Sequence, residues 1–213
     1  MRRVYVLCEG LTEAAFADQV LRPRLPSETL LVPIDQKGRG GITYPRLKRD
    51  IQSLLGGEAV VTTMLDLYAL PENYPRHQES QAYRNPLERA RVIERAIEED
   101  IGSRRFVPYL QVYEFEALWF AEGLARLKRD LPHRGEAIDT LLNSIHYFQT
   151  PEHINDQAPP KSRITAAVPE YRRASFRNFE GFPLDQARER CLHFDAWLAK
   201  LEETLGLRKQ SIT

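Results

Sequence analysis

Cysteine is scarce in this chain of 213 residues, where only Cys8 and Cys191 occur, far apart and outside any CxxC pair. A disulfide framework and a zinc site are therefore not expected. An excess of charge of one sign is also lacking, because 30 basic and 30 acidic residues cancel. This balance excludes a strongly charged nucleic-acid coat or an acidic tail, although it leaves room for local charged patches.

Long hydrophobic runs are missing as well. No apolar run approaches the roughly 20 residues that span a bilayer. The first run, which follows Arg2 and Arg3, ends at Glu9 after five residues, and this is too short for a signal peptide. We therefore expect a cytoplasmic protein with no membrane partner.

The length and the hydrophobic content of 42% suit one domain of moderate size, or a domain with a small helical appendage. In the first half of the chain, short runs rich in β-forming residues alternate with segments of helical periodicity. This alternation predicts an α/β fold with a mostly parallel four-stranded sheet flanked by helices. The expected strands lie at residues 4–8, 29–34, 59–65 and 106–112.

The C-terminal third has a different pattern, with helical periodicity at residues 136–145 and 184–205 and a loop-rich span between them. We therefore expect an α/β domain at residues 1–125 and a helical C-terminal extension at residues 126–213 that packs on it. Near the N-terminus, Thr12 is expected to cap the helix that follows the first strand.

Acidic residues follow three of the four expected strands: Glu9, Asp66 and Glu114, with Glu116 close behind. The carboxyl ends of parallel strands share one edge of a sheet, where α/β folds place their sites. Clustered carboxylates need a cation or a proton between them, and oxygen ligands without His or Cys suit Mg²⁺ or Mn²⁺. A carboxylate after a strand is also common as a helix cap or turn former, so each acid alone has a structural explanation.

Five motifs stand out along the chain: "LCEGLTE", "TTMLDLYALP", "IGSRRFVPYLQVYEFEALWF", "INDQAPPKSR" and "HFDAWLAKLE". Together they resemble a bacterial family of unknown function, number 4276 among such families, which is Toprim-like. The resemblance covers nearly the whole chain, and it implies a Toprim-like sheet related to the Toprim domains of OLD-type nucleases. It also implies a gene setting beside AAA or SMC-like ATPases, in clusters suggestive of phage defence.

The resemblance also assigns site residues. Glu9 matches the invariant Toprim glutamate, Asp66 matches the first acid of the usual Asp-x-Asp pair, and Glu13 matches a second acid of the OLD-type versions. The chain departs from the pattern at Tyr68, which stands where the second Asp is expected. Glu114 or Glu116 is the candidate replacement for this missing metal ligand.

Basic residues supply candidates for phosphate binding. Lys37 and Arg39 lie in a glycine-rich loop, residues 36–41, ahead of an expected helix. Lys161 and Arg163 lie in "PPKSRI", where they could neutralise a transition-state phosphate. A surface turn and a solvated loop are the plain alternatives. Gly10 is a further candidate, because glycine permits the close approach of a phosphate.

Three functions remain open at this point. The first is a metal-dependent phosphodiester hydrolase acting on nucleic acid, in which Mg²⁺ or Mn²⁺ lies on Glu9, Asp66 and Glu114 and Lys161 offsets charge. The second is a non-catalytic Toprim-like module that binds nucleic acid or a partner ATPase, which Tyr68 favours. The third is a small-molecule nucleotide-binding protein that uses the glycine-rich loop, although no GxGxxG fingerprint supports it.

Overall fold

The computed structural model describes residues 2–37, 42–146, 148–154, 158–172 and 177–207. Strands and helices alternate as far as Gln111, and the chain beyond that point is helical. The strands are β1 (Arg2–Cys8), β2 (Thr29–Asp35), β3 (Val60–Asp66), β4 (Phe106–Val107) and β5 (Leu110–Gln111). The α-helices are α1 (Leu11–Phe16), α2 (Tyr44–Leu54), α3 (His77–Ser80), α4 (Pro86–Ile101), α5 (Glu116–Ala121), α6 (Ala125–Asp130), α7 (Gly135–Ser144), α8 (Pro160–Ala167), α9 (Leu184–Arg190) and α10 (Leu192–Thr204).

The sheet has the strand order β2-β1-β3-β4, and β5 pairs with β3 beyond the end of β4. Every pairing between these strands is parallel. The register aligns Cys8 of β1 with Asp35 of β2 and with Met64 of β3, so these strands finish close to one another. The predicted mostly parallel α/β fold is confirmed.

The fourth expected strand is interrupted, and the prediction of one continuous strand at residues 106–112 is wrong. Pro108 has no N–H to donate, so the ladder with β3 breaks between β4 and β5. Threonine hydroxyls of β3 replace the missing bonds: Thr62 donates to Val107 O at 2.6 Å, and Thr63 donates to Tyr109 O at 3.0 Å while accepting from Tyr109 N at 2.8 Å.

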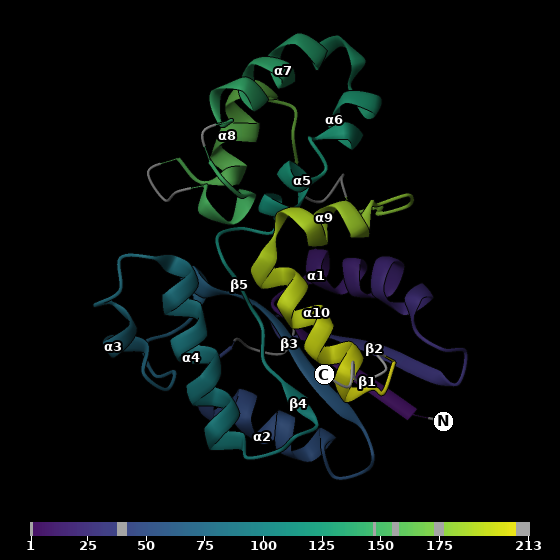
Figure 1. Cartoon of the computed structure of the whole chain (residues 1–213), viewed down its shortest axis with the longest axis vertical. Helices are drawn as coiled ribbons and strands as arrows, with labels where there is room; N and C mark the ends of the chain where they lie inside the picture. Colours follow the sequence, from purple (N-terminus) through teal and green to yellow (C-terminus); the bar gives the residue numbers. More distant parts are fainter. Residues whose placement is uncertain (1, 38–41, 147, 155–157, 173–176, 208–213) are drawn as a thin grey trace, which may run out of the picture.

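Helices cover both faces of the sheet. On one face, side chains of α2 and α4 pack against Leu7, Val61 and Leu65. On the other face, α1 and α10 pack against alternate strand residues such as Val6 and Met64. Figure 1 shows α10 crossing in front of the strands. This arrangement buries both faces, which explains why the strands are continuous apolar runs without polar alternation.

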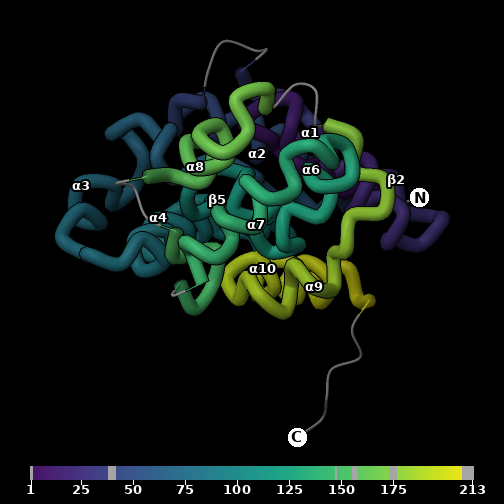
Figure 2. The backbone as a smooth tube through the Cα atoms, turned by 90° about the horizontal axis from the view of Figure 1, so that it is seen from above, coloured from purple at the N-terminus to yellow at the C-terminus, as the bar shows by residue number. Residues whose placement is uncertain are grey.

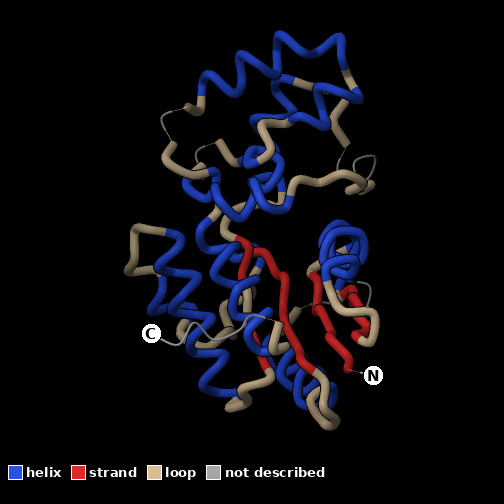
Figure 3. The backbone as a smooth tube through the Cα atoms, turned by 45° about the vertical axis from the view of Figure 1, so that its right-hand side comes forward, coloured by secondary structure: helices blue, strands red, loops and turns tan. Residues whose placement is uncertain are grey.

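The helices α5 to α8 lie beyond the carboxyl end of the sheet, and Figure 3 shows the strands confined to the opposite half of the molecule. Figure 2, which looks down from that end, shows α6, α7 and α8 nearest the viewer. The single helix predicted at residues 184–205 is in fact two helices that meet at Cys191, whose backbone is not helical (φ −119°, ψ 87°). The break lets α9 lie against α5 while α10 packs on β4.

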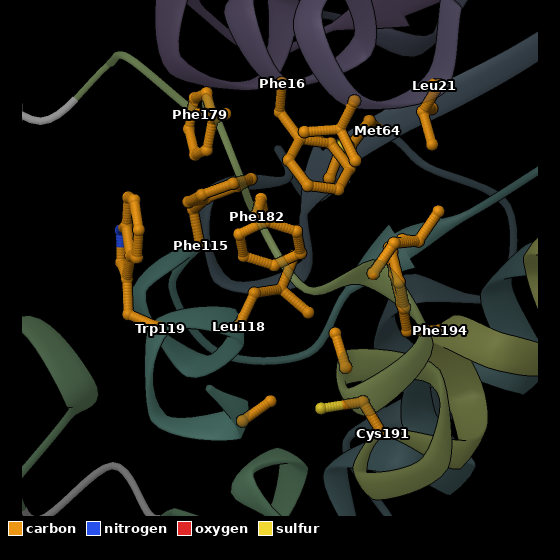
Figure 4. Packing of buried hydrophobic residues seen from close by; sticks show 14 of the residues in the cluster. Phe16, Leu21, Met64, Phe115, Leu118, Trp119, Phe179, Phe182, Cys191 and Phe194 are labelled. Carbon is orange, nitrogen blue, oxygen red and sulfur yellow. The ribbon is translucent and has the colours of Figure 1, made fainter. Parts of the chain in front are cut away.

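An aromatic cluster joins the sheet layer to these helices (Figure 4). Phe16 of α1 lies at its centre, with ring centroids 5.3–6.0 Å from four phenylalanines. In the same hydrophobic core, Trp197 of α10 donates from Nε1 to Thr62 Oγ1 of β3 at 2.8 Å. The C-terminal helices thus share one hydrophobic core with a sheet face, while the division into domains at residue 125 stays a prediction. The partners of Phe16 are Phe115, Phe179, Phe182 and Phe194.

Glu122, directly after α5, is a buried carboxylate with an unusual environment. Its side chain is 7% exposed. Its Oε1 and the Nη1 atom of Arg126 are buried, and neither has a hydrogen-bond partner within the described ranges. Burial raises the pKa of Glu122 to about 7, although the backbone N–H and the charge of Arg126 act in the opposite direction.

This raised pKa predicts a pH dependence of stability. Between the ordinary pKa of glutamate and about pH 7, the folded state holds a proton on Glu122 that the unfolded state has released, so stability should fall as the pH rises through this window. Glu122→Gln should remove that slope and should be more stable than wild type above pH 7, by on the order of 2–3 kcal/mol. Urea unfolding at pH 5 and pH 8 measures both effects. Glu136→Gln, on an exposed residue of α7, is the control; equal slopes in all three proteins would contradict the prediction.

Candidate functional site

Glu9 lies at the carboxyl end of β1 and is only 6% exposed. Its backbone N–H donates to Met64 O at 3.0 Å, which extends the pairing with β3 by one residue. Its Oε2 accepts a hydrogen bond from the backbone N–H of Asp66 at 2.9 Å, and its Oε1 forms an ion pair with the Lys37 ammonium. The buried carboxylate is therefore held between a strand end and a cation.

Asp66 is the last residue of β3, and the structure brings it next to Glu9. Its Oδ1 accepts from the backbone N–H of Tyr68 at 2.9 Å, which caps the short helical turn Leu67–Ala69. Asp66 therefore has the capping role that is common for an acid after a strand, and its backbone also contacts Glu9. The two acids from neighbouring parallel strands share one edge of the sheet.

The other two predicted metal ligands lie toward the C-terminal helices. Glu114 Oε2 accepts from the backbone N–H of Lys161 at 2.7 Å, so Glu114 and Lys161 are neighbours at the N-terminus of α8. Glu116 is completely buried at the start of α5 and accepts from the hydroxyl of Tyr171 at 3.0 Å. The hydrogen bonds of both acids therefore tie the loop after β5 to the helical part of the chain.

Gly10 and Glu13 form the start of α1. The helix is capped at Gly10, so the prediction that Thr12 caps it is wrong: the chain turns helical two residues earlier, and Thr12 is already inside the helix. Glu13 Oε2 accepts from the backbone N–H of Gly10 at 3.2 Å. The φ of Gly10 is −155°, an extended conformation open to any residue, so the backbone itself does not require glycine.

Two arginines were predicted to bind phosphate, Arg163 and Arg39. Arg163 donates from Nε to Ala158 O at 2.6 Å, and its guanidinium carbon lies 5.5 Å from the ring centroid of Phe148. These contacts of Arg163 therefore stabilise the loop that precedes α8. Arg39 lies outside the described residues.

Two polar residues at the same edge, Asp35 and Gln36, were not predicted as site residues. Asp35 ends β2 in register with Cys8, and the motif "TLLVPID" carried the signal, because this strand also finishes on an acid. Burial raises the pKa of the Cys8 thiol, and the nearby carboxylates of Glu13 and Asp35 raise it further. Gln36 is fully buried, and neither atom of its side-chain amide has a hydrogen-bond partner in the described part of the chain.

Comparison with known proteins identifies the family. A family model described as "Domain of unknown function (DUF4276)" matches residues 8–202, and this segment includes the ends of all the strands. The chain belongs to the DUF4276 family. No curated protein and no solved structure gave a match. Within the ranges that the structure describes, no helix of this DUF4276 protein has the length and apolar character needed to cross a membrane.

The side chains at the sheet edge of this DUF4276 protein carry oxygen ligands, the type that binds a hard cation. They are the carboxylates of Glu9, Asp66 and Asp35, which lie at or just after the ends of β1, β3 and β2, while the raised pKa keeps Cys8 a thiol. Among the described residues, however, no three His, Cys, Asp or Glu side chains are grouped to hold one ion. Mg²⁺ is usually held by one or two carboxylates together with waters and substrate phosphates, and Glu9 with Asp66 fits that pattern.

Proposed function

We propose that this DUF4276 protein is a metal-dependent phosphodiester hydrolase, a nuclease of Toprim type, with Mg²⁺ or Mn²⁺ on Glu9 and Asp66. One observation carries the proposal: the buried carboxylate of Glu9 contacts the backbone of Asp66 where two parallel strands finish. A carboxylate in this position needs a cation, and the cation it has here is the exposed ammonium of Lys37.

The chain's own residues then have distinct roles in the proposed reaction. When bound, the metal polarises the phosphate and lowers the pKa of a water. Glu9 and Asp66 would hold the metal, with Glu114 as a further candidate ligand. Lys37, which forms an ion pair with Glu9 in this structure, would bind the phosphate. Lys161, next to Glu114, offsets charge on the leaving side.

A second candidate is a non-catalytic Toprim-like module that binds nucleic acid or an ATPase. Two observations favour it: Tyr68 stands where the resemblance expects the second acid, and Lys37 forms an ion pair with Glu9. An AAA or SMC-like ATPase partner, a phage-defence role and a cytoplasmic location belong to both proposals and rest on the resemblance and the sequence pattern alone.

The proposal is tested by incubating the purified protein with circular DNA, linear DNA and RNA, with Mg²⁺ and then Mn²⁺. We expect metal-dependent cleavage that EDTA abolishes. Cleavage that persists in EDTA would contradict the metal mechanism, and an absence of cleavage with retained nucleic-acid binding would favour the non-catalytic module.

Thermal melts in Mn²⁺ alone test the metal site without any substrate. Wild type should gain stability by mass action, about 1.4 kcal/mol when the metal concentration is ten times its Kd. Lys37→Met should gain more than wild type at the same Mn²⁺ concentration, because the ammonium that competes for Glu9 is gone. Equal gains in the two proteins would mean that the metal binds elsewhere.

A further inference from the structure

Tyr68 is part of an aromatic stack at the proposed site. Its ring, 41% exposed, lies 5.3 Å from that of Tyr113 with an interplanar angle of 18°. The guanidinium carbon of Arg89, from the first turns of α4, lies 5.3 Å from the ring centroid of Tyr68. Because the backbone N–H of Tyr68 donates to Asp66, this stack is attached directly to a proposed metal ligand.

The backbone at Tyr113 has a strained conformation. Its φ is +59°, in the left-handed region that bulky residues rarely adopt. Its side chain is nevertheless 96% buried, at 4% exposure, just before Glu114. Such strain persists only where the surrounding structure imposes it, and it is concentrated at functional sites.

Arg89 keeps hydrogen-bonding capacity in this position. Contact with the face of a ring uses none of the five N–H donors of a guanidinium. The Nε atom of Arg89 is buried and has no hydrogen-bond partner in the part of the chain that the structure describes. Arg91 and Arg95 of the same helix instead line a separate cavity of about 220 Å³ between α4 and α10, together with His193.

We propose that Arg89, held against Tyr68, binds a phosphate of the nucleic-acid backbone beside Asp66; this inference rests on the proposed function. A guanidinium presents paired donors that match phosphate oxygens. The ring of Tyr68 contacts Arg89 while the backbone N–H of Tyr68 donates to Asp66, so the guanidinium is held beside the proposed metal ligand.

The test measures binding of a fluorescein-labelled oligothymidylate by anisotropy, in EDTA and over a range of salt concentrations. Arg89→Gln should weaken binding about 10- to 150-fold, as expected for the loss of a charged hydrogen bond. It should also reduce the slope of log K against log salt by about 0.7, the value for one phosphate contact on a single strand. Arg95→Gln removes the same charge from the same helix at the separate cavity and should leave the slope unchanged.

Variants of Tyr68 test whether the stack positions Arg89. Tyr68→Phe keeps the ring and should bind like wild type, whereas Tyr68→Ala should lose as much salt slope as Arg89→Gln. Equal slopes for Arg89→Gln and Arg95→Gln, equal binding by the two Tyr68 variants, or no oligothymidylate binding by wild type would overturn the subsite.

Failure of this inference can be told apart from failure of the proposed function. Metal-dependent cleavage by wild type, with an unchanged salt slope in Arg89→Gln, would overturn the subsite and leave the hydrolase. Binding that depends on Arg89, without cleavage in either metal, would support the subsite and overturn the hydrolase.

Discussion

Glu9→Gln should lower metal-dependent phosphodiester cleavage by about 10³-fold, the upper end of what loss of one electrostatic group at a catalytic site costs. The amide keeps the size of the side chain and an oxygen that can accept from Asp66 N, so the strand-end contact survives. It removes the negative charge that holds Lys37 in the present structure and would hold a metal in the proposed one. The measurement is the initial cleavage rate on the preferred substrate.

The matched control is Glu58→Gln, which makes the same charge change at an exposed residue just before β3, at the opposite end of that strand. It should cleave at the wild-type rate. The Mn²⁺ stabilisation of Glu9→Gln should also vanish, while Glu58→Gln retains it. Unimpaired cleavage by Glu9→Gln would show that another site is responsible for the activity.

Phe16→Ala should destabilise the protein by about 3–5 kcal/mol, the usual cost of removing a buried phenylalanine side chain from a packed core. Phe16 is fully buried and contacts rings from α10 and from the segments before α5 and α9. The cavity left by alanine would therefore open between the sheet layer and the C-terminal helices. Phe16→Leu, which fills most of the space, should cost about 1 kcal/mol.

Urea unfolding followed by tryptophan fluorescence and by far-ultraviolet circular dichroism measures the effect of Phe16→Ala. The two signals should coincide, because the sheet face and the C-terminal helices share one hydrophobic core. Separate transitions, with only one of them shifted by the substitution, would show that the two parts of the chain fold independently.

The expected strands show where local pattern is a reliable guide. The first three, each a run of apolar β-forming residues, lie within about one or two residues of the observed bounds. The fourth run contains Pro108, and the strand breaks there because proline has no N–H for the ladder, while threonine hydroxyls of β3 supply replacement bonds. Pro108 indicated where the fourth strand could break, but the break also depended on hydrogen bonds from β3, which is distant in sequence.

The site likewise combines features that the local sequence predicts with contacts between residues distant in sequence. Parallel strand order places Glu9 and Asp66 at one edge, which the positions of these acids after apolar runs already indicated. The partners of the Glu9 carboxylate were not predictable, because Lys37, which follows β2, and the backbone N–H of Asp66, at the end of β3, are distant from Glu9 along the chain. Nor was the pairing of Arg89 with Tyr68, since these residues are far apart in sequence.

Periodicity within short windows was sufficient to predict the α/β class, the alternation of strands and helices, the helical C-terminus and the acids at the ends of strands. Three features required the packed structure: Glu114 meets Lys161, Glu116 meets Tyr171, and α9 and α10 separate at Cys191. The two polar contacts join groups that come together only once the elements have packed. A buried polar group without a hydrogen-bond partner costs free energy of folding. It therefore pairs with a suitable donor or acceptor even when that group is distant along the chain.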